Sequence, residues 1–228
     1  MRYQRVCTNT LSIMIKMIEH LHEPWGIKDC QSRHLFMNKA ARLYTCTPAA
    51  FDLEGRLDCE FPATWAEQAE GFIEHDRQAE SEGKGVSVIE TDFWFGRKEL
   101  HPYISEKIPF RDANGVCMGT LWNARKIRVL SPYVCISDKK PGVLHTASDQ
   151  SVFTRSEMDM IFYLMKNLSQ KEVANHLGLS AKTINNKMQN IYRKTGVNSV
   201  SALYEFCSHK NLQNYIPEFA INKGIKFI

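Results

Sequence analysis

Four amide side chains are gathered in one short stretch of the chain, "TINNKMQN" at residues 183–190. Asn and Gln can donate and accept a hydrogen bond at once, a pattern that matches the N6 and N7 edge of adenine in the major groove of DNA. Asn185, Asn186 and Gln189 are therefore candidate base-reading residues. A merely solvated helix face usually carries Glu, Lys, Arg and Ala, which favour helix more strongly than Asn does. The absence of Asp and Glu from residues 181–196 argues against that alternative.

Cationic and hydroxyl-bearing side chains surround these amides and are candidates for contacts with DNA phosphates. The candidates are Lys171, Ser180, Lys182, Thr183, Lys187, Asn190, Arg193 and Lys194. The distribution of charge agrees with this interpretation. Residues 151–210 hold 8 Lys/Arg and 4 Asp/Glu, a net of +4, whereas residues 1–150 hold 19 and 20, a net of −1. The excess positive charge therefore lies where a polyanion would be met.

Helix-start signals precede the amide-rich stretch twice. Thr154 with Glu157, and Ser169 with Glu172, have the three-residue spacing of capping boxes, in which each side chain satisfies a backbone donor of the first turn. Both boxes are followed by apolar residues at helical spacing. The sequence therefore predicts two helices before the amide-rich one.

The amide-rich segment itself is predicted to be the second helix of a helix-turn-helix. Gly178 suits the left-handed position that ends a helix, and Ser180 can cap the next helix after a short turn. Ile184, Met188 and Ile191 then recur at i, i+4 and i+7, which predicts a buried stripe. The candidate reading residues fall on the opposite, exposed face. A fourth helix is expected to start at Asn198 or Ser199.

Residues 153–197 resemble the DNA-binding domain of LuxR-type bacterial transcription regulators. The matching positions are Phe153-Thr154, Glu157, Leu168-Ser169, Lys171-Glu172-Val173-Ala174, Leu177, Ser180, Thr183-Ile184, Asn190-Ile191, Lys194 and Gly196-Val197. The resemblance implies a four-helix domain over 153–210. It also implies that the third helix enters the major groove and that the fourth pairs two subunits, here through Val200 and Leu203.

This sequence departs from the family pattern at four positions. Ser156 stands where an arginine is usual, and Asn167 where a glycine is usual. Asn185 replaces the usual lysine, and Lys187 the usual histidine. Because two of these changes are on the predicted reading helix, the family's consensus DNA site is not expected to apply.

The front part of the chain mixes strand and helix patterns between residues 24 and 128. Thr64 and Glu67 have capping-box spacing and predict a helix from residue 64. The segments "WGIKDCQSRHLFMNKAARLYT" and "KIPFRDANGVCMGTLWNARKI" resemble the opening and closing strands of a PAS domain. The resemblance implies an α+β fold with a five-stranded antiparallel sheet and flanking helices, which senses a ligand or a partner. The flavin-binding motif of light-sensing members is absent, so a light sensor is not expected.

Three further segments complete the expected organisation. Residues 1–23 are predicted to contain a helix in which Leu11, Met14 and Ile18 form an apolar seam; this seam pairs two subunits or packs on its own domain. Residues 129–152 are rich in turn residues and are predicted to be a linker. Residues 211–228 form a C-terminal extension that is too apolar to stay free and is expected to pack on another part of the protein.

The remaining patterns exclude several classes of protein. No apolar run is long enough to cross a membrane, and seven scattered cysteines without a C-x-x-C fit free thiols in a reducing cytoplasm. No phosphate loop, nucleophile elbow or paired-carboxylate pattern occurs, so no enzyme is expected. No metal or other cofactor is expected either, although His75 leaves a haem-bearing sensor as a weaker alternative.

The leading hypothesis is a cytoplasmic, dimeric transcription regulator that binds double-stranded DNA and receives a small-molecule or protein signal at its PAS-like domain. The rival hypothesis is a protein-interaction or dimerisation module with little affinity for DNA.

Overall fold

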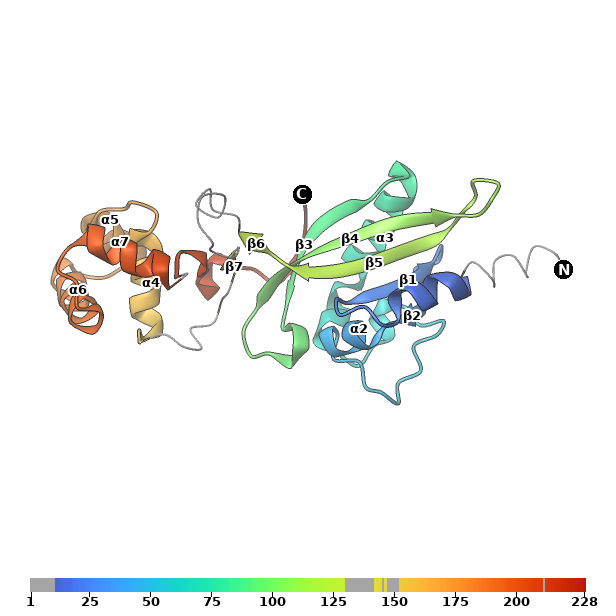
Figure 1. The fold of residues 1–228 in the computed structure, drawn as a ribbon, viewed down its shortest axis with the longest axis horizontal. Helices are drawn as coiled ribbons and strands as arrows, with labels where there is room; N and C mark the ends of the chain where they lie inside the picture. Colours follow the sequence, from blue (N-terminus) through green and yellow to red (C-terminus); the bar gives the residue numbers. More distant parts are fainter. Residues whose placement is uncertain (1–10, 130–141, 145, 147–151, 211) are drawn as a thin grey trace. The chain divides into compact units, whose positions relative to one another are not determined.

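The computed structural model describes residues 11–129, 142–144, 146, 152–210 and 212–228 (Figure 1). The chain divides into two compact units. The first comprises residues 1–127 together with 222–228, and the second comprises residues 128–221. The predicted linker, 129–152, lies for the most part outside the described residues. None of the helices in the described part of the chain is long and apolar enough to cross a membrane.

The first unit is built on one antiparallel sheet. Its strands are β1 (Trp25–Asp29), β2 (His34–Met37), β3 (Val86–Asp92), β4 (His101–Arg111), β5 (Cys117–Lys126) and β8 (Gly224–Phe227). They lie in the order β2-β1-β5-β4-β3-β8, and each neighbouring pair is antiparallel. The predicted α+β class is confirmed. The sheet has six strands instead of the predicted five, because the C-terminal extension supplies β8.

A helical segment at residues 11–18, two further α-helices and three 3₁₀ turns accompany the sheet in the part of this unit that the structure describes. The helices are α2 (Lys39–Tyr44) and α3 (Ala69–Glu82), and the turns are η1 (Asp58–Glu60), η2 (Thr64–Gln68) and η3 (Trp94–Gly96). The capping box predicted at Thr64 is wrong. The Thr64 hydroxyl donates to the Asp92 carboxylate on β3 at 3.2 Å, and the segment 64–68 is a 3₁₀ turn. The α-helix therefore begins only at residue 69.

Alternation along β4 and helical spacing along α3 build the interior of this unit. His101, Tyr103, Ser105 and Lys107 are the buried positions at the start of β4, at every second residue. The buried face of α3 consists of Ala69, Phe72, His75, Asp76 and Ala79. The core also holds Tyr44, Trp65, Trp94 and Trp122, so it is rich in aromatic rings. Both patterns place polar groups among the apolar ones.

The described part of the second unit contains four α-helices. These are α4 (Arg155–Leu164), α5 (Gln170–Leu177), α6 (Ala181–Thr195) and α7 (Val200–His209). Both predicted capping boxes, at Thr154 and Ser169, are confirmed. Gly178 ends α5 with φ of 62°, and Ser180 caps α6 by accepting from the Thr183 amide. The predicted helix-turn-helix is therefore present. A short β6 (Arg128–Val129) pairs with β7 (Gly142–Val143) in the same unit.

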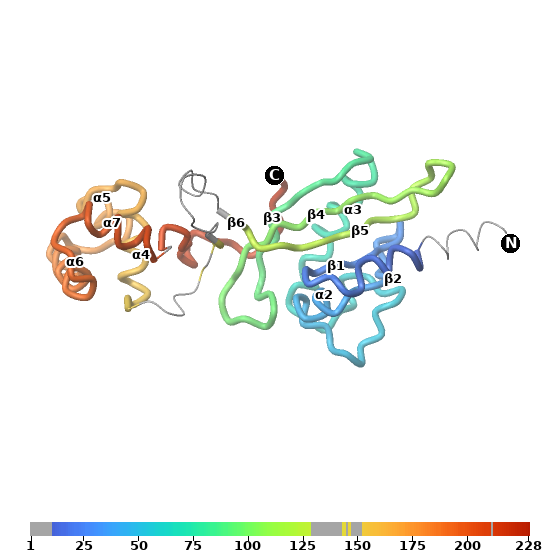
Figure 2. The backbone as a smooth tube through the Cα atoms, in the orientation of Figure 1, coloured from blue at the N-terminus to red at the C-terminus, as the bar shows by residue number. Residues whose placement is uncertain are grey.

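The C-terminal extension returns to the first unit. Val88 of β3 is paired with Phe227, and Thr91 with Gly224. Ile225 packs against the aromatic core, so the expectation that the extension packs on another part of the protein is confirmed. Figure 2 shows this last segment beside β3, although more than 130 residues separate the two strands in the sequence.

Candidate nucleic-acid interface and buried polar pocket

Helix α6 presents an amide-rich face to solvent. Its inward face consists of Ile184, Met188 and Ile191, which are at most 1% exposed. Asn185, Asn186 and Gln189 are all exposed, as expected for residues on the opposite face. The structure thus brings the three candidate reading residues together on one face of one helix, and their contact with bases stays a prediction.

The candidate phosphate-binding residues are partly engaged within the protein. Lys171 and Lys182 are exposed, and Arg193 donates to the Asn190 side chain at 3.1 Å. Lys194 differs from these, because its ammonium group lies 2.6 Å from the buried carboxylate of Glu157. Burial would raise the pKa of Glu157, but the Lys194 and Thr154 hydrogen bonds lower it below its ordinary value. Lys194 therefore ties α6 to the start of α4.

Two departures from the LuxR pattern contact each other. The Lys187 ammonium donates to the Ser156 hydroxyl at 2.8 Å. The cation at this contact therefore comes from α6, whereas α4 contributes an uncharged hydroxyl. A third departure also has a structural reason. Asn167 has φ of 63°, a left-handed conformation that Asn tolerates better than other residues with a side chain.

The candidate dimer contacts differ in their exposure. Val200 of α7 is half-buried, but Leu203 is completely buried in the core of the second unit. In the helical segment 11–18, Leu11 and Met14 are half-buried and Ile18 is 6% exposed. The side chains of Leu203 and Ile18 are thus buried within their own units. Pairing of two subunits through Val200, Leu11 and Met14 stays a prediction.

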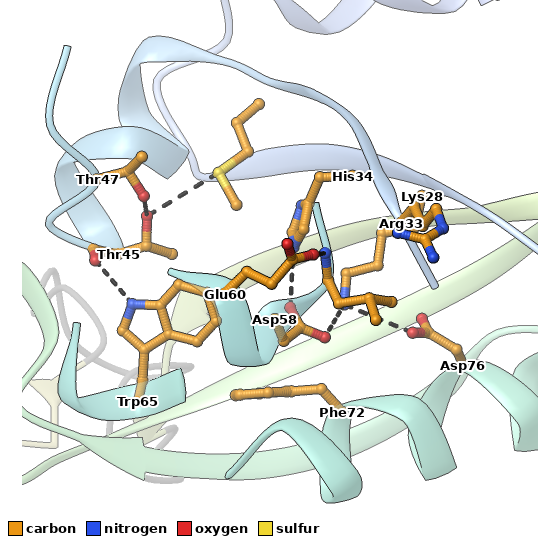
Figure 3. A network of polar contacts seen from close by, with 12 residues as sticks. Lys28, Arg33, His34, Thr45, Thr47, Asp58, Glu60, Trp65, Phe72 and Asp76 are labelled. Carbon is orange, nitrogen blue, oxygen red and sulfur yellow. Dashed lines mark hydrogen bonds and ion pairs between the residues drawn. The ribbon is translucent and has the colours of Figure 1, made fainter. Parts of the chain in front are cut away.

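A network of buried charges crosses the interior of the first unit (Figure 3). The Lys28 ammonium contacts Asp58 at 2.5 Å and Asp76 at 3.5 Å, and Lys107 contacts Asp76 at 2.6 Å. His34 is 2.8 Å from the second oxygen of Asp58. All five side chains are at most 3% exposed. Two ammonium groups and two carboxylates balance one another within this network.

The pKa values of this network follow from burial and pairing. Burial would raise the pKa of Asp58, but Lys28 and His34 outweigh it and lower that pKa to about 2. Burial lowers the pKa of Lys107 to about 8, although Asp76 opposes the shift. Burial also lowers the pKa of His34, with help from Lys28, so this imidazole is neutral at pH 7. The two carboxylates remain ionised.

A small cavity of about 30 Å³ lies beside the network. Its lining comprises Lys28, His34, Met37, Tyr44, Thr45, Asp58, Trp65, Phe72, Glu90, Trp94, Ser105, Lys107 and Trp122. Glu90 accepts a hydrogen bond from the Tyr44 hydroxyl at 2.7 Å, and burial raises the pKa of Glu90 to about 7. A second hollow of about 370 Å³ shares Tyr44, Thr45, Trp65 and Trp94 with the cavity. The cavity alone holds little more than water. The four shared side chains line both spaces.

Sequence reasoning missed this network. The available signal was a set of polar residues at positions where the strand period predicts core, such as Ser105 and Lys107 on β4. His75, the candidate haem ligand, is fully buried and donates its Nε2–H to the Val86 carbonyl at 2.8 Å. That hydrogen bond joins α3 to β3, which gives this imidazole a structural role.

Family models match both units. A model described as bacterial regulatory proteins of the luxR family matches residues 151–207, and one described as PAS fold matches residues 18–131. Among curated proteins, the Fimbriae Z protein of Escherichia coli (strain K12) is 37% identical over 60 residues, which is 26% of this chain and 29% of that protein. The chain thus matches less than a third of the length of this relative.

Two solved structures share the fold over nearly the whole chain. A Vibrio cholera VqmA–ligand–DNA complex has a TM-score of 0.74 at 23% identity and covers 94% of this chain and 95% of that chain. A phage VqmA–DPO complex has a TM-score of 0.67 at 18% identity and covers 99% of both chains. At identities below 25%, this likeness shows that the chain has the same fold as these proteins.

Proposed function

Because the chain belongs to the PAS fold family and carries a domain of the luxR family of bacterial regulatory proteins, we propose that it is a cytoplasmic transcription regulator. In this proposal, the helical unit binds double-stranded DNA as a homodimer, and the PAS unit receives a signal that changes this binding. The Vibrio cholera relative was solved with both a ligand and DNA, which supports the same division of roles here.

The exposed face of α6 is the observation that carries the proposal. It holds Asn185, Asn186 and Gln189 on a helix whose other face is buried, with Lys182 beside them and no acidic residue on the helix. Amide side chains can read adenine through paired hydrogen bonds, and the cations can contact phosphates around the groove. We assign base reading to the three amides, and phosphate contact to the candidate cations and to Ser180, Thr183 and Asn190.

A binding titration tests this assignment. Genome-wide mapping of bound DNA supplies the site, and fluorescence anisotropy then measures its affinity for the full-length protein. Gln189→Ala is expected to lose about 1–3 kcal/mol of binding free energy at one base pair and to become indifferent to that base. Gln213→Ala, which removes an exposed amide outside the helix-turn-helix, is the matched control. Unchanged affinity and base preference in Gln189→Ala would contradict base reading.

The dependence on salt separates this function from the rival one. DNA binding through phosphates weakens steeply as salt rises, because counterions are recaptured. A module that binds only protein would show weak DNA binding with little dependence on salt. Half-sites about one helical turn apart are expected for the dimer, and light scattering of the complex that gives one chain per site would contradict it.

For the PAS unit, we assign the signal to a small polar molecule at the buried cavity. The ammonium groups of Lys28 and Lys107 and the Glu90 carboxyl offer both donors and an acceptor, and Trp65 and Trp94 offer flat apolar walls. Movement of the side chains shared with the larger hollow would enlarge the cavity. Native mass spectrometry of the purified protein is expected to show a small-molecule adduct, whose removal changes affinity for DNA. Identical DNA binding before and after removal would contradict this assignment.

A further inference from the structure

Two cysteines and a glutamate converge at one edge of the first unit. Cys30 follows β1, Cys117 opens β5 and Glu80 lies in the last turn of α3, so three separate elements contribute. One donor atom from each residue lies within 4.8 Å of the others, and all three residues are half-buried. This group lies apart from the cavity, whose lining includes none of the three.

The hydrogen bonds at this group leave one oxygen without a donor. Arg77 contacts one carboxylate oxygen of Glu80 at 2.7 Å and donates to the Cys30 carbonyl at 2.5 Å. The other oxygen, Oε1, is buried, and no hydrogen-bond donor contacts it among the residues that the structure describes. The Cys30 thiol donates to the Cys117 carbonyl at 3.1 Å. The Cys117 thiol donates to the Gly119 carbonyl at 3.7 Å, so Oε1 of Glu80 is the atom of this group that lacks a hydrogen-bond partner among the described residues.

We propose that Cys30, Glu80 and Cys117 bind a thiophilic divalent cation of the zinc type. Zinc is held tetrahedrally by thiolate, imidazole and carboxylate ligands, and neighbouring ligand atoms then stand about 3.8 Å apart. The observed spacing within 4.8 Å needs only small side-chain rotations to reach this geometry. Water completes the four ligands, because the described part of the chain brings three donors to the group.

The charges at the site favour a doubly charged ion. Two thiolates and one carboxylate would carry three negative charges, and Arg77 contributes one positive charge, so a divalent cation makes the group neutral. Metal binding releases the two thiol protons, so the bound form carries both thiolates.

A disulfide between the two cysteines is the competing explanation. It would use both sulfur atoms, but it would leave the buried Glu80 oxygen without a partner. A cation uses all three groups, and it would join α3 to the ends of β1 and β5.

Cobalt titration of the full-length protein tests the site. The protein is reduced, stripped with a chelator and titrated with Co²⁺, a spectroscopic substitute for Zn²⁺. We expect one equivalent to bind with a thiolate-to-cobalt charge-transfer band, and Zn²⁺ to displace it. Cys117→Ser, which leaves one thiolate, is expected to lower the intensity of the band and weaken binding at least tenfold, and Glu80→Gln, which keeps the shape of the side chain, to weaken binding at least tenfold. Cys46→Ser and Cys59→Ser, which remove exposed thiols, are the controls and should keep the band.

Three results would overturn the proposal. They are the absence of a charge-transfer band in the wild-type protein, a band of unchanged intensity and affinity in Cys117→Ser, and a mass two hydrogens lower with linked Cys30 and Cys117 peptides before reduction. If Cys117→Ser does not fold by circular dichroism, Glu80→Gln and a Zn²⁺-dependent rise in the unfolding temperature of the wild-type protein decide the question. None of these measurements depends on DNA binding, so the site and the proposed function can fail separately.

Discussion

The two units of this protein place their charged side chains in opposite ways. In the PAS unit, Lys28, Asp58, Asp76 and Lys107 are buried and satisfy one another. In the helical unit, most of the cations of α5 and α6 are exposed or half-exposed, and Lys194 is the member that is bound to a buried carboxylate. Buried charges are costly when a partner is lost, whereas exposed charges contribute little to stability and remain available to a ligand. The comparison thus separates two roles. The buried charges of the PAS unit stabilise its fold and line its cavity, whereas the exposed charges of the helical unit are free to bind a polyanion.

The largest expected effect comes from removing a buried carboxylate. Asp76→Ala leaves Lys107 and Lys28 buried with one counterion fewer, and it is expected to cost about 3–5 kcal/mol in the free energy of unfolding. Urea unfolding followed by tryptophan fluorescence measures the loss, because the four tryptophans lie in this unit. A loss below about 1 kcal/mol would show that removing a buried charge of the PAS unit costs no more than removing an exposed one.

A second, smaller effect concerns pH. Burial raises the pKa of Glu90 from 4.5 to about 7, so between these values the folded protein holds a proton that the unfolded chain has lost. Stability therefore falls by up to about 1.4 kcal/mol per pH unit as pH rises through this window. His75 opposes this trend, because its pKa is lowered from 6.5 to about 4, mainly by burial. Glu90→Gln removes only the Glu90 contribution and should gain stability relative to the wild type as pH rises from 4.5 to 7. Parallel stability curves would contradict the prediction.

A third prediction concerns an exposed cation of the helical unit. Lys182→Ala is expected to leave the unfolding free energy nearly unchanged, since the side chain is exposed at the start of α6. It should reduce the slope of log affinity against log salt by about one unit, which corresponds to one lost phosphate contact. Anisotropy titrations at several salt concentrations measure the slope. Lys210→Ala, at an exposed position after α7, serves as the control and should keep it.

The smallest effect is expected for an exposed ion pair in the PAS unit itself. Arg56 and Glu60 are 3.0 Å apart, with side chains 50% and 36% exposed. Arg56→Ala should change the free energy of unfolding far less than Asp76→Ala does, because an exposed ion pair contributes little. Measured beside Asp76→Ala by the same urea method, Arg56→Ala tests whether the burial of a charged residue determines how much stability its removal costs. Equal losses of unfolding free energy in the two variants would show that burial does not determine it.

The sequence predicted the helical unit more completely than the PAS unit, for a physical reason. Capping at Thr154 and Ser169 and the buried stripe of α6 depend on residues within two turns of one another, so their spacing identifies them. The exposed amide face follows directly from that stripe. The start of α3 could not be predicted in this way, because the Thr64 hydroxyl bonds to Asp92, 28 residues further along.

The buried network could not be predicted from local spacing either, because its residues are also far apart in the sequence. Lys28, Asp58, Asp76 and Lys107 come from four different elements, and each looks like an ordinary surface charge in its own segment. Only the packing of the sheet, α3 and η1 against one another brings them together. The pairing of β8 with β3 could not be predicted locally either, because β8 begins at Gly224, 132 positions after β3 ends at Asp92.

The pairing of β8 with β3 also has a consequence for synthesis of the chain. Strands β1 to β5 leave the ribosome first, while the outer edge of β3 still lacks its neighbour. Helices α4 to α7 of the second unit are made next, and β8 is translated after them. An uncovered strand edge is a site for pairing with other chains. The first unit therefore completes its sheet last, and a nascent chain that stalls before residue 224 exposes an aggregation-prone edge.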